Sequence, residues 1–258
     1  MSYSKTQVQE LLAKFREVTS GLSELQLLCI RHGSEVENLQ AREYLHQGAG
    51  RRAGILKRAI ENIFSVFPPN QERPLRHEAI LDVQINLHSF LVNLYGIFDN
   101  WAWAYLLHHG RVEMVGHRQN IGLFKSKTMA LLPAPLRSYV SSETTSKWYE
   151  TYLKQYRDAL AHRIPVYIPP STYSPEESSR YSELEDEKIT CMGTQNSDGI
   201  RAIGDEQALL GGPCLLFLHS LSEYKDARPI YFHPQLMCDA GTVLEFGELF
   251  FEHWRENA

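Results

Sequence analysis

The sequence predicts a mainly α-helical protein, a helical bundle with a small α+β or irregular appendage after residue 165. Three observations favour this class. Apolar residues recur at helical spacing through much of the first 165 residues, and several glycines and prolines end these segments. Short β-prone runs occur only beyond that point. The 258 residues, 43% of them hydrophobic, suffice for one large domain or two small ones.

The first helical segment covers residues 5–20, where apolar residues fall on one face until Gly21 interrupts the pattern. A polar-rich helical run then starts near Ser34 and Glu37, which stand three residues apart as in a capping box, and it ends near Gly48. Two helices separated by a linker are therefore expected before residue 50.

A third helix is expected over residues 51–67, because Pro68 and Pro69 follow it and neither can donate a backbone hydrogen bond. The stretch 74–109 has no proline after its first residue and predicts one long helix. Several polar residues in this helix follow steps of three and four, so they share one face. This polar stripe faces either solvent or a hydrophilic cleft within the bundle, and it consists of Asp82, Asn86, Ser89, Asn93, Gly96 and Asn100.

A fifth helix is expected from a cap at Ser146 to about His162, with Pro165 ending it. Residues 171–188 are rich in Ser, Glu and Tyr, which predicts an exposed loop. Residues 234–254 regain helical spacing and should pack back on the bundle. Short β-prone runs suggest a small sheet or an irregular appendage, and they lie at residues 166–168, 189–192, 214–218 and 230–232.

These segments predict three parts: a helical bundle over residues 1–165, a small mixed appendage with an acidic loop over 166–233, and a C-terminal helix over 234–258. No part predicts a membrane span. The least polar stretch, residues 88–107, includes polar side chains that are costly in lipid and ordinary in a bundle core.

Composition favours a cytoplasmic protein. The four cysteines lie far apart without a CxxC pair, as expected in a reducing compartment, and the first fifteen residues lack the apolar core of a signal peptide. Net charge is −5, and residues 171–207 hold nine acids against three bases, so the remainder is close to neutral. That charge balance argues against a broad basic surface that binds long nucleic acid through many phosphates, but it leaves binding to a short RNA element open.

Motifs for several common chemistries are missing from the sequence. It has no phosphate-binding G-x-x-x-x-G-K, no G-x-G-x-x-G and no H-E-x-x-H. Nucleotide hydrolysis and dinucleotide redox chemistry are therefore disfavoured, and we expect no cofactor and no metal ion. His77 and His88 share a face with Asp82 roughly between them, which leaves a bundle-core metal site as a minor alternative.

One string combines the residue types needed to cleave RNA without a metal. Asp158 and His162 are four residues apart, so on a helix the carboxylate can orient the imidazole. The planar fork of Arg157 suits a phosphate group. His162 would move the proton of the ribose 2′-hydroxyl, and Arg157 would stabilise charge on the phosphorane-like transition state.

The string Arg157-Asp158-x-x-x-His162 resembles the R-x4–6-H motif of the HEPN superfamily, in which a polar residue commonly follows the arginine. The resemblance covers about residues 75–165. It implies a helical bundle and a metal-independent endoribonuclease, of the kind found in toxin–antitoxin, phage-defence and RNA-processing systems. It also implies an RNA substrate, a homodimer whose two motifs face one cleft, and an antitoxin or regulatory partner. Arg157 and His162 would be the motif residues, Asp158 the polar neighbour, and Asp99 or Asn100 a supporting group from the long helix.

Alternative interpretations remain open for the same residues. A HEPN-like bundle could bind RNA, a nucleotide or a protein without cleavage, or the string could be a solvated charge pair with a histidine at a helix end. The aromatic residues of the long helix could stack bases, although core packing is the simpler interpretation. The best candidates for RNA phosphate contacts are Arg51, Arg52, Lys57 and Arg58. The solvated start of a helix explains this basic cluster equally well.

Overall fold

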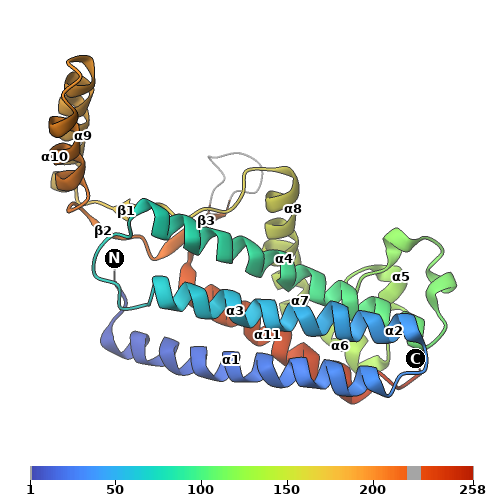
Figure 1. Ribbon diagram of the computed structural model, residues 1–258. Coiled ribbons are helices and arrows are strands. Elements are labelled where there is room, and N and C mark those ends of the chain that lie inside the picture. The colour runs from blue at the N-terminus through green and yellow to red at the C-terminus, as the bar shows by residue number, and fades with distance from the viewer. Residues whose placement is uncertain (1, 220–227, 258) are drawn as a thin grey trace.

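The computed structural model describes residues 2–219 and 228–257 and confirms the mainly α class. Four long helices run side by side as a bundle (Figure 1). They are α1 (Lys5–Ser34), α3 (Arg51–Val66), α4 (His77–His108) and α11 (Phe232–His253). α3 and α4 make the most extensive contact between helices, and α1 packs on both α3 and α11. The C-terminal helix α11 thus packs on the bundle through α1.

Helix α1 is longer than the sequence pattern predicts. Ser4 caps it through a capping box with Gln7, and the helix passes through Gly21 without a break. A glycine inside a helix costs only about 1 kcal/mol. A Cβ at Gly21 would lie 2.7 Å from Leu244 Cδ1, so the glycine lets α11 approach closely. The expected interruption at Gly21 is therefore wrong.

The capping box predicted at Ser34 and Glu37 is also wrong. The Ser34 hydroxyl donates back to the Ile30 carbonyl at 2.9 Å, and Asn38 caps the next helix by accepting from two backbone N–H groups. The chain then runs continuously through α2 (Leu39–Glu43), the π-helical turn η1 (Tyr44–Gly50) and α3. Gly48 therefore does not end a helical run, because the turn η1 joins α2 directly to α3.

Helix α4 forms over most of the stretch expected to be one long helix. Its interior supplies the aromatic core: Phe98, Trp101 and Tyr105 are buried, and Trp103 stacks on Tyr44 with ring centroids 5.3 Å apart. Phe98, Trp101 and Tyr105 are therefore core residues that are not free to stack on bases, whereas Trp103 is only partly buried. Among the described residues, no helix has the length and apolar content to cross a membrane.

The polar stripe of α4 packs against α3. Asn62 Nδ2 donates to Asn86 Oδ1 at 2.9 Å, and Arg52 donates to both Asn93 and Asn100. A polar seam thus joins the two helices, and much of the stripe faces neither solvent nor an open cleft.

After α4 the chain forms short helices before returning across the bundle. Ser142, not Ser146, caps the next run by accepting from Thr145 N–H. This run continues to His162 through α7 (Glu143–Trp148), a second π-helical turn η4 (Tyr149–Leu153), and α8 (Lys154–His162), which packs against α4. The short elements between α4 and α7 are η2 (Val112–Val115), η3 (Arg118–Asn120), α5 (Ser126–Met129) and α6 (Ala134–Ser141).

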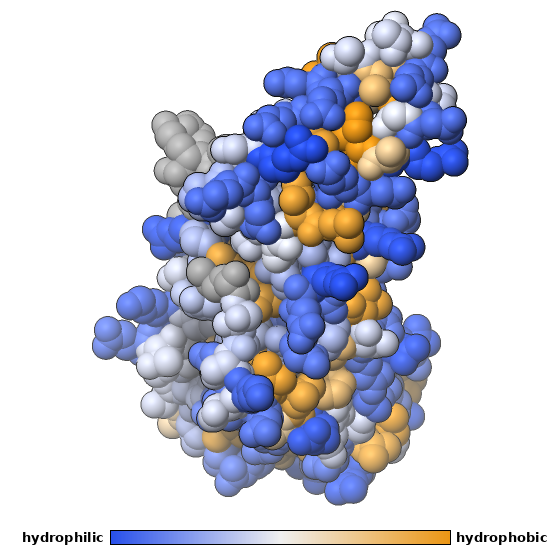
Figure 2. All heavy atoms as spheres, turned by 90° about the vertical axis from the view of Figure 1, so that its left-hand side faces the viewer, coloured by the Kyte–Doolittle hydropathy of each residue, from blue (hydrophilic) through white to orange (hydrophobic). Residues whose placement is uncertain are grey.

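The segment expected to be an acidic loop is a helical hairpin. α9 (Pro175–Gly193) and α10 (Ser197–Gln207) pack chiefly on each other and project from one end of the bundle (Figure 1). We call this hairpin the arm. Figure 2 shows it standing out from the body with mostly hydrophilic side chains. The loop at 171–188 and the strand at 189–192 are wrong predictions, because Ser174 and Glu177 form a capping box that starts α9.

Two small antiparallel ribbons complete the fold. β1 (Ser171–Thr172) pairs with β2 (Gly212–Pro213) at the base of the arm, and β3 (Leu216–His219) pairs with β4 (Arg228–Tyr231). In the second ribbon Leu216 lies opposite Tyr231. The β-prone runs near 214–218 and 230–232 therefore do form strands, and part of the run at 166–168 adds a single bridge from Tyr167 to Leu218.

Candidate functional site

The contact between α4 and α8 brings together the predicted residues Asp99 and Arg157. The guanidinium carbon of Arg157 lies 4.7 Å from the centroid of the Tyr95 ring, one turn before Asp99 on α4. Arg157 is half-exposed, and its Nε is 2.7 Å from Asp158 Oδ1, close enough for an ion pair but out of line for a hydrogen bond. The arginine therefore reaches inward to α4 while part of it stays open to solvent.

Asp99 is the most perturbed carboxyl of this region. Burial raises its pKa from 3.8 to about 6, and the nearby cations Arg157, Lys125 and Arg52 only partly offset that effect. The backbone of Gly122 closes over the carboxylate, since a Cβ there would lie 3.1 Å from Asp99 Oδ1. A buried carboxyl with a pKa near neutrality, within reach of three cations, is an arrangement found often at functional sites.

Two tyrosines form the wall of the same group. Burial raises the pKa of Tyr95 and of Tyr149, and the charge of Asp99 raises both further. Their ring centroids are 6.4 Å apart, and Phe124 stacks on Tyr149 at 4.1 Å. We call the whole group the Asp99 cluster: Arg52, Tyr95, Asp99, Lys125, Tyr149 and Arg157.

Arg52 enters the cluster from α3. Its Nε donates to Asn100 Oδ1 at 2.8 Å and its Nη1 donates to Asn93 Oδ1 at 2.9 Å. The side chain lies across Gly96, where a Cβ would come within 2.4 Å of the guanidinium carbon. Asn100, expected as a supporting polar group, thus holds Arg52, while its neighbour Asp99 faces Arg157.

The four basic residues proposed for phosphate contacts do not form one exposed patch. Arg52 lies in the polar seam, whereas Arg51 and Arg58 are exposed. Lys57 and Arg58 both pair with Glu61, at 3.7 and 3.4 Å. Arg51 is the member of this set whose charge is exposed and takes part in no ion pair in the described part of the chain.

His162 stands apart from the cluster. It is exposed at the last residue of α8, and the ion pair that Asp158 makes within the described residues is with Arg157. The cavity inside the cluster is only about 10 Å³, lined by Tyr95, Asp99 and Lys125 among others, so it has room for about one water molecule. A phosphate or a ribose can meet this site only from the solvent side of Arg157.

The sequence indicated Asp99, Asn100, Arg157 and Asp158, and it did not indicate Tyr95, Lys125 or Tyr149 as site residues. Nothing in the spacing of these three residues points to the cluster, because they converge from α4, from the N-cap of α5 and from η4 only through packing. Among the described residues no group of histidine, cysteine and carboxylate side chains is placed to hold a metal ion, and His88 instead bonds through Nε2 to the Val166 carbonyl at 2.8 Å.

Both arginines of the cluster follow a π-helical turn. Arg52 is the second residue after η1, and Arg157 is the fourth residue after η4. Such turns are uncommon in proteins as a whole, and those that occur are often found at functional sites.

The comparisons with protein-family models, with curated proteins and with solved structures found no match for this chain.

Proposed function

We propose that the protein is a HEPN-like, metal-independent endoribonuclease whose phosphate site is the solvent side of Arg157. The observation that carries this proposal is the position of Arg157 on α8, over the Tyr95 ring of α4 and near the buried, high-pKa carboxyl of Asp99. The supporting physical argument is that an arginine fixed by an aromatic ring and a carboxylate is preorganised for phosphate.

In the proposed reaction the ribose 2′-oxygen attacks the adjacent phosphorus and loses its proton to His162. The bond from phosphorus to the 5′-oxygen breaks, the 5′-oxygen takes up a proton from water, and a 2′,3′-cyclic phosphate remains. Arg157 would stabilise the negative charge that builds on the phosphate oxygens. Asp158 would hold Arg157 in place, and Asp99 with Asn100 would support the arginines from α4.

The exposed position of His162 is compatible with this role, since the RNA would cross the end of α8 from outside. Arg51 and Arg58 lie on another helix, α3, and would contact more distant phosphates. As in HEPN proteins generally, we expect a homodimer, and we propose an antitoxin or regulatory partner and a cytoplasmic location. All four cysteines are free, as that location requires.

Cleavage of mixed tRNA and mRNA in the presence of a chelator tests the proposal. Wild type should yield fragments with 2′,3′-cyclic phosphate ends, and both His162→Ala and Arg157→Met should lose at least about 100-fold in rate. Matched controls are His77→Ala and Arg137→Met, which remove exposed residues of the same types elsewhere. Inactive wild type, or equal rates in all five proteins, would refute the ribonuclease.

A second candidate is a non-catalytic interaction protein with the same bundle. The observation that favours it is the arm, whose two helices pack chiefly on each other and leave most of their surface free. A binding protein of this kind would leave RNA uncut yet retain a partner or an RNA ligand, and loss of binding on removal of residues 174–210 would identify the arm as the contact.

A further inference from the structure

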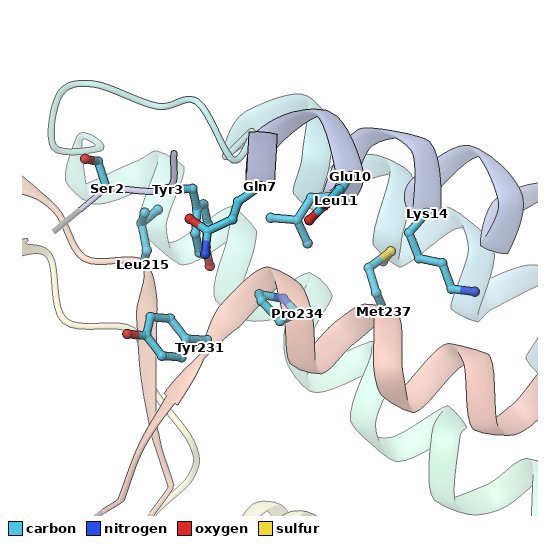
Figure 3. A pocket seen from close by; sticks show the side chains of 10 residues that line it. All are labelled: Ser2, Tyr3, Gln7, Glu10, Leu11, Lys14, Leu215, Tyr231, Pro234 and Met237. Atoms are coloured by element: carbon cyan, nitrogen blue, oxygen red, sulfur yellow. The ribbon is translucent and has the colours of Figure 1, made fainter. Parts of the chain in front are cut away.

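A cavity of about 540 Å³ lies between the start of α1, the β3–β4 ribbon and the start of α11. None of the residues that line it belongs to the Asp99 cluster. Figure 3 shows side chains from α1 and from α11 facing one another across this space. Its volume falls within the usual range for small-molecule sites, about 300–1,000 Å³. The cavity is large enough for a ring compound with a short tail.

The floor of this cavity is apolar and well packed. Leu11, Leu215 and Met237 line it, and each of them is buried in the fold. Because their surfaces are fixed by the core, the floor is preformed and does not depend on binding. An apolar ring placed there would pack on this floor and would shield the exposed part of the cavity wall from water.

Two tyrosine rings form one side of the cavity. The centroids of Tyr3 and Tyr231 are 6.4 Å apart with their planes at 44°, and Tyr231 is 52% exposed. Tyrosine faces attract cations through the negative charge of the ring, by about 0.5–1 kcal/mol at exposed sites. An exposed tyrosine next to a preformed apolar floor indicates a surface built for a ligand with an apolar body and a positive end.

The rim of the cavity has one carboxylate that forms no ion pair with a cation of the described residues. Lys14 Nζ bonds to Glu17 Oε1 at 2.6 Å, so its charge is already paired outside the cavity. Glu10 lies one turn earlier on the same side and makes no ion pair within the described residues. The free charge at the rim is therefore negative, which favours a cationic ligand and disfavours an anionic one.

We propose that this cavity binds a small amine that carries an aromatic ring, with the ring on the floor formed by Leu11 and Met237 and the ammonium between Glu10 and the face of Tyr231. The Tyr3 ring, held in a T-shaped contact with the His233 ring at 5.6 Å between centroids, closes the site on the side of α1. This binding site is independent of RNA cleavage.

Titration of the full-length protein with 2-phenylethylamine, followed by calorimetry and by NMR, tests the site. The expected result is saturable binding with a Kd of about 0.1–1 mM and shifts at Tyr231 and Met237. The matched probes are 3-phenylpropionate, which replaces the ammonium with a carboxylate, and 2-phenylethanol, which is neutral. We expect the anion to bind at least about tenfold more weakly and the alcohol to fall between them.

Two exposed positions provide variants that should fold normally. Glu10→Gln should weaken amine binding about five- to tenfold and leave the affinity for the alcohol unchanged, and Tyr231→Ala should weaken both. Glu248→Gln is the matched control, since it removes the same charge from an exposed site about three turns beyond Met237 on α11. Equal affinity for amine and anion, an equal loss in Glu248→Gln, or no saturable binding up to about 10 mM would each overturn the proposal.

Discussion

Arg157 lies over the ring of Tyr95, with 4.7 Å between the guanidinium carbon and the ring centroid, and this contact joins α8 to α4. It also fixes the arginine of the string Arg157-Asp158-x-x-x-His162. Because Arg157 is half-exposed, the contact is worth about 0.5–1 kcal/mol. Its strength can be measured separately from any activity.

A double-mutant cycle between these two residues should therefore show coupling. We expect Tyr95→Leu and Arg157→Met to be less destabilising together than the sum of the two single changes, by about 0.5–1 kcal/mol in urea unfolding. Tyr95→Phe keeps the ring face and should retain most of the coupling. Strictly additive losses would show that the contact contributes no stability.

Asp99 should make stability depend on pH. Its folded pKa of about 6 lies above the ordinary value of 3.8, so the folded state holds the proton more tightly than the unfolded state does. Wild type should lose stability relative to Asp99→Asn as pH rises from about 4 to 6, by about 2–3 kcal/mol in total. Parallel stability curves for the two proteins across that window would contradict the assignment.

The arginine in the polar seam should not tolerate lysine. Arg52 donates to two asparagines of α4 at once, and a lysine ammonium lacks the planar fork that makes this geometry possible. Arg52→Lys should lower the free energy of unfolding by about 1–3 kcal/mol, because it leaves an asparagine acceptor unpaired. Arg51→Lys, one residue earlier and exposed, is the control and should change stability by less than about 0.5 kcal/mol.

A second buried carboxyl, Asp239, should also make stability depend on pH, at higher pH values than Asp99 does. Trp148 Nε1 and Gln235 Nε2 both donate to its Oδ1, at 2.8 and 2.7 Å, while Oδ2 has no partner within the described residues. Complete burial raises its pKa to about 7. An asparagine can keep both bonds without a charge, so Asp239→Asn should be more stable than wild type above pH 7 and lose this advantage toward pH 4. Thermal unfolding of both proteins at pH 5 and at pH 8 measures the stability difference between them on each side of this pKa.

The arm should unfold apart from the bundle. Leu184 is its fully buried leucine, and the two helices pack chiefly on each other. Leu184→Ala should remove about 2–3 kcal/mol from the arm alone. Limited proteolysis should then cut within residues 175–207 at least tenfold faster, as expected for a local opening equilibrium, while the main thermal transition of the bundle stays in place. A large drop in that transition would show that the arm and the bundle unfold together.

The sequence pattern predicts the long elements well and the junctions poorly. Helix α4 follows from thirty-two residues of nearly unbroken helical spacing, for which packing and local preference agree. Gly21 was misjudged because a single glycine is a weak local signal, and contact with Leu244 outweighs it. In the arm, the acidic composition suggested a loop, whereas the capping box from Ser174 to Glu177 was the more informative local signal.

The candidate site divides in the same way. Arg157 was indicated by its string with Asp158 and His162, and Asp99 only as one of two supporting groups that the resemblance of this string implied. Arg52 was assigned to a surface patch, since no sequence spacing shows that α3 would bury it against Asn93 and Asn100. Lys125 reaches the cluster from the start of a four-residue helix, a position set by tertiary packing alone.

The two π-helical turns set the rotational phase of both arginines. Each turn accommodates one residue more than an α-helical turn, and one residue corresponds to about 100° around the helix axis. Deleting a single residue from η1 or η4 would leave a continuous helix but would turn Arg52 away from α4, or Arg157 away from Tyr95. The chemistry of this cluster therefore depends on the exact number of residues upstream of each arginine, so length changes there should be tolerated far less than substitutions.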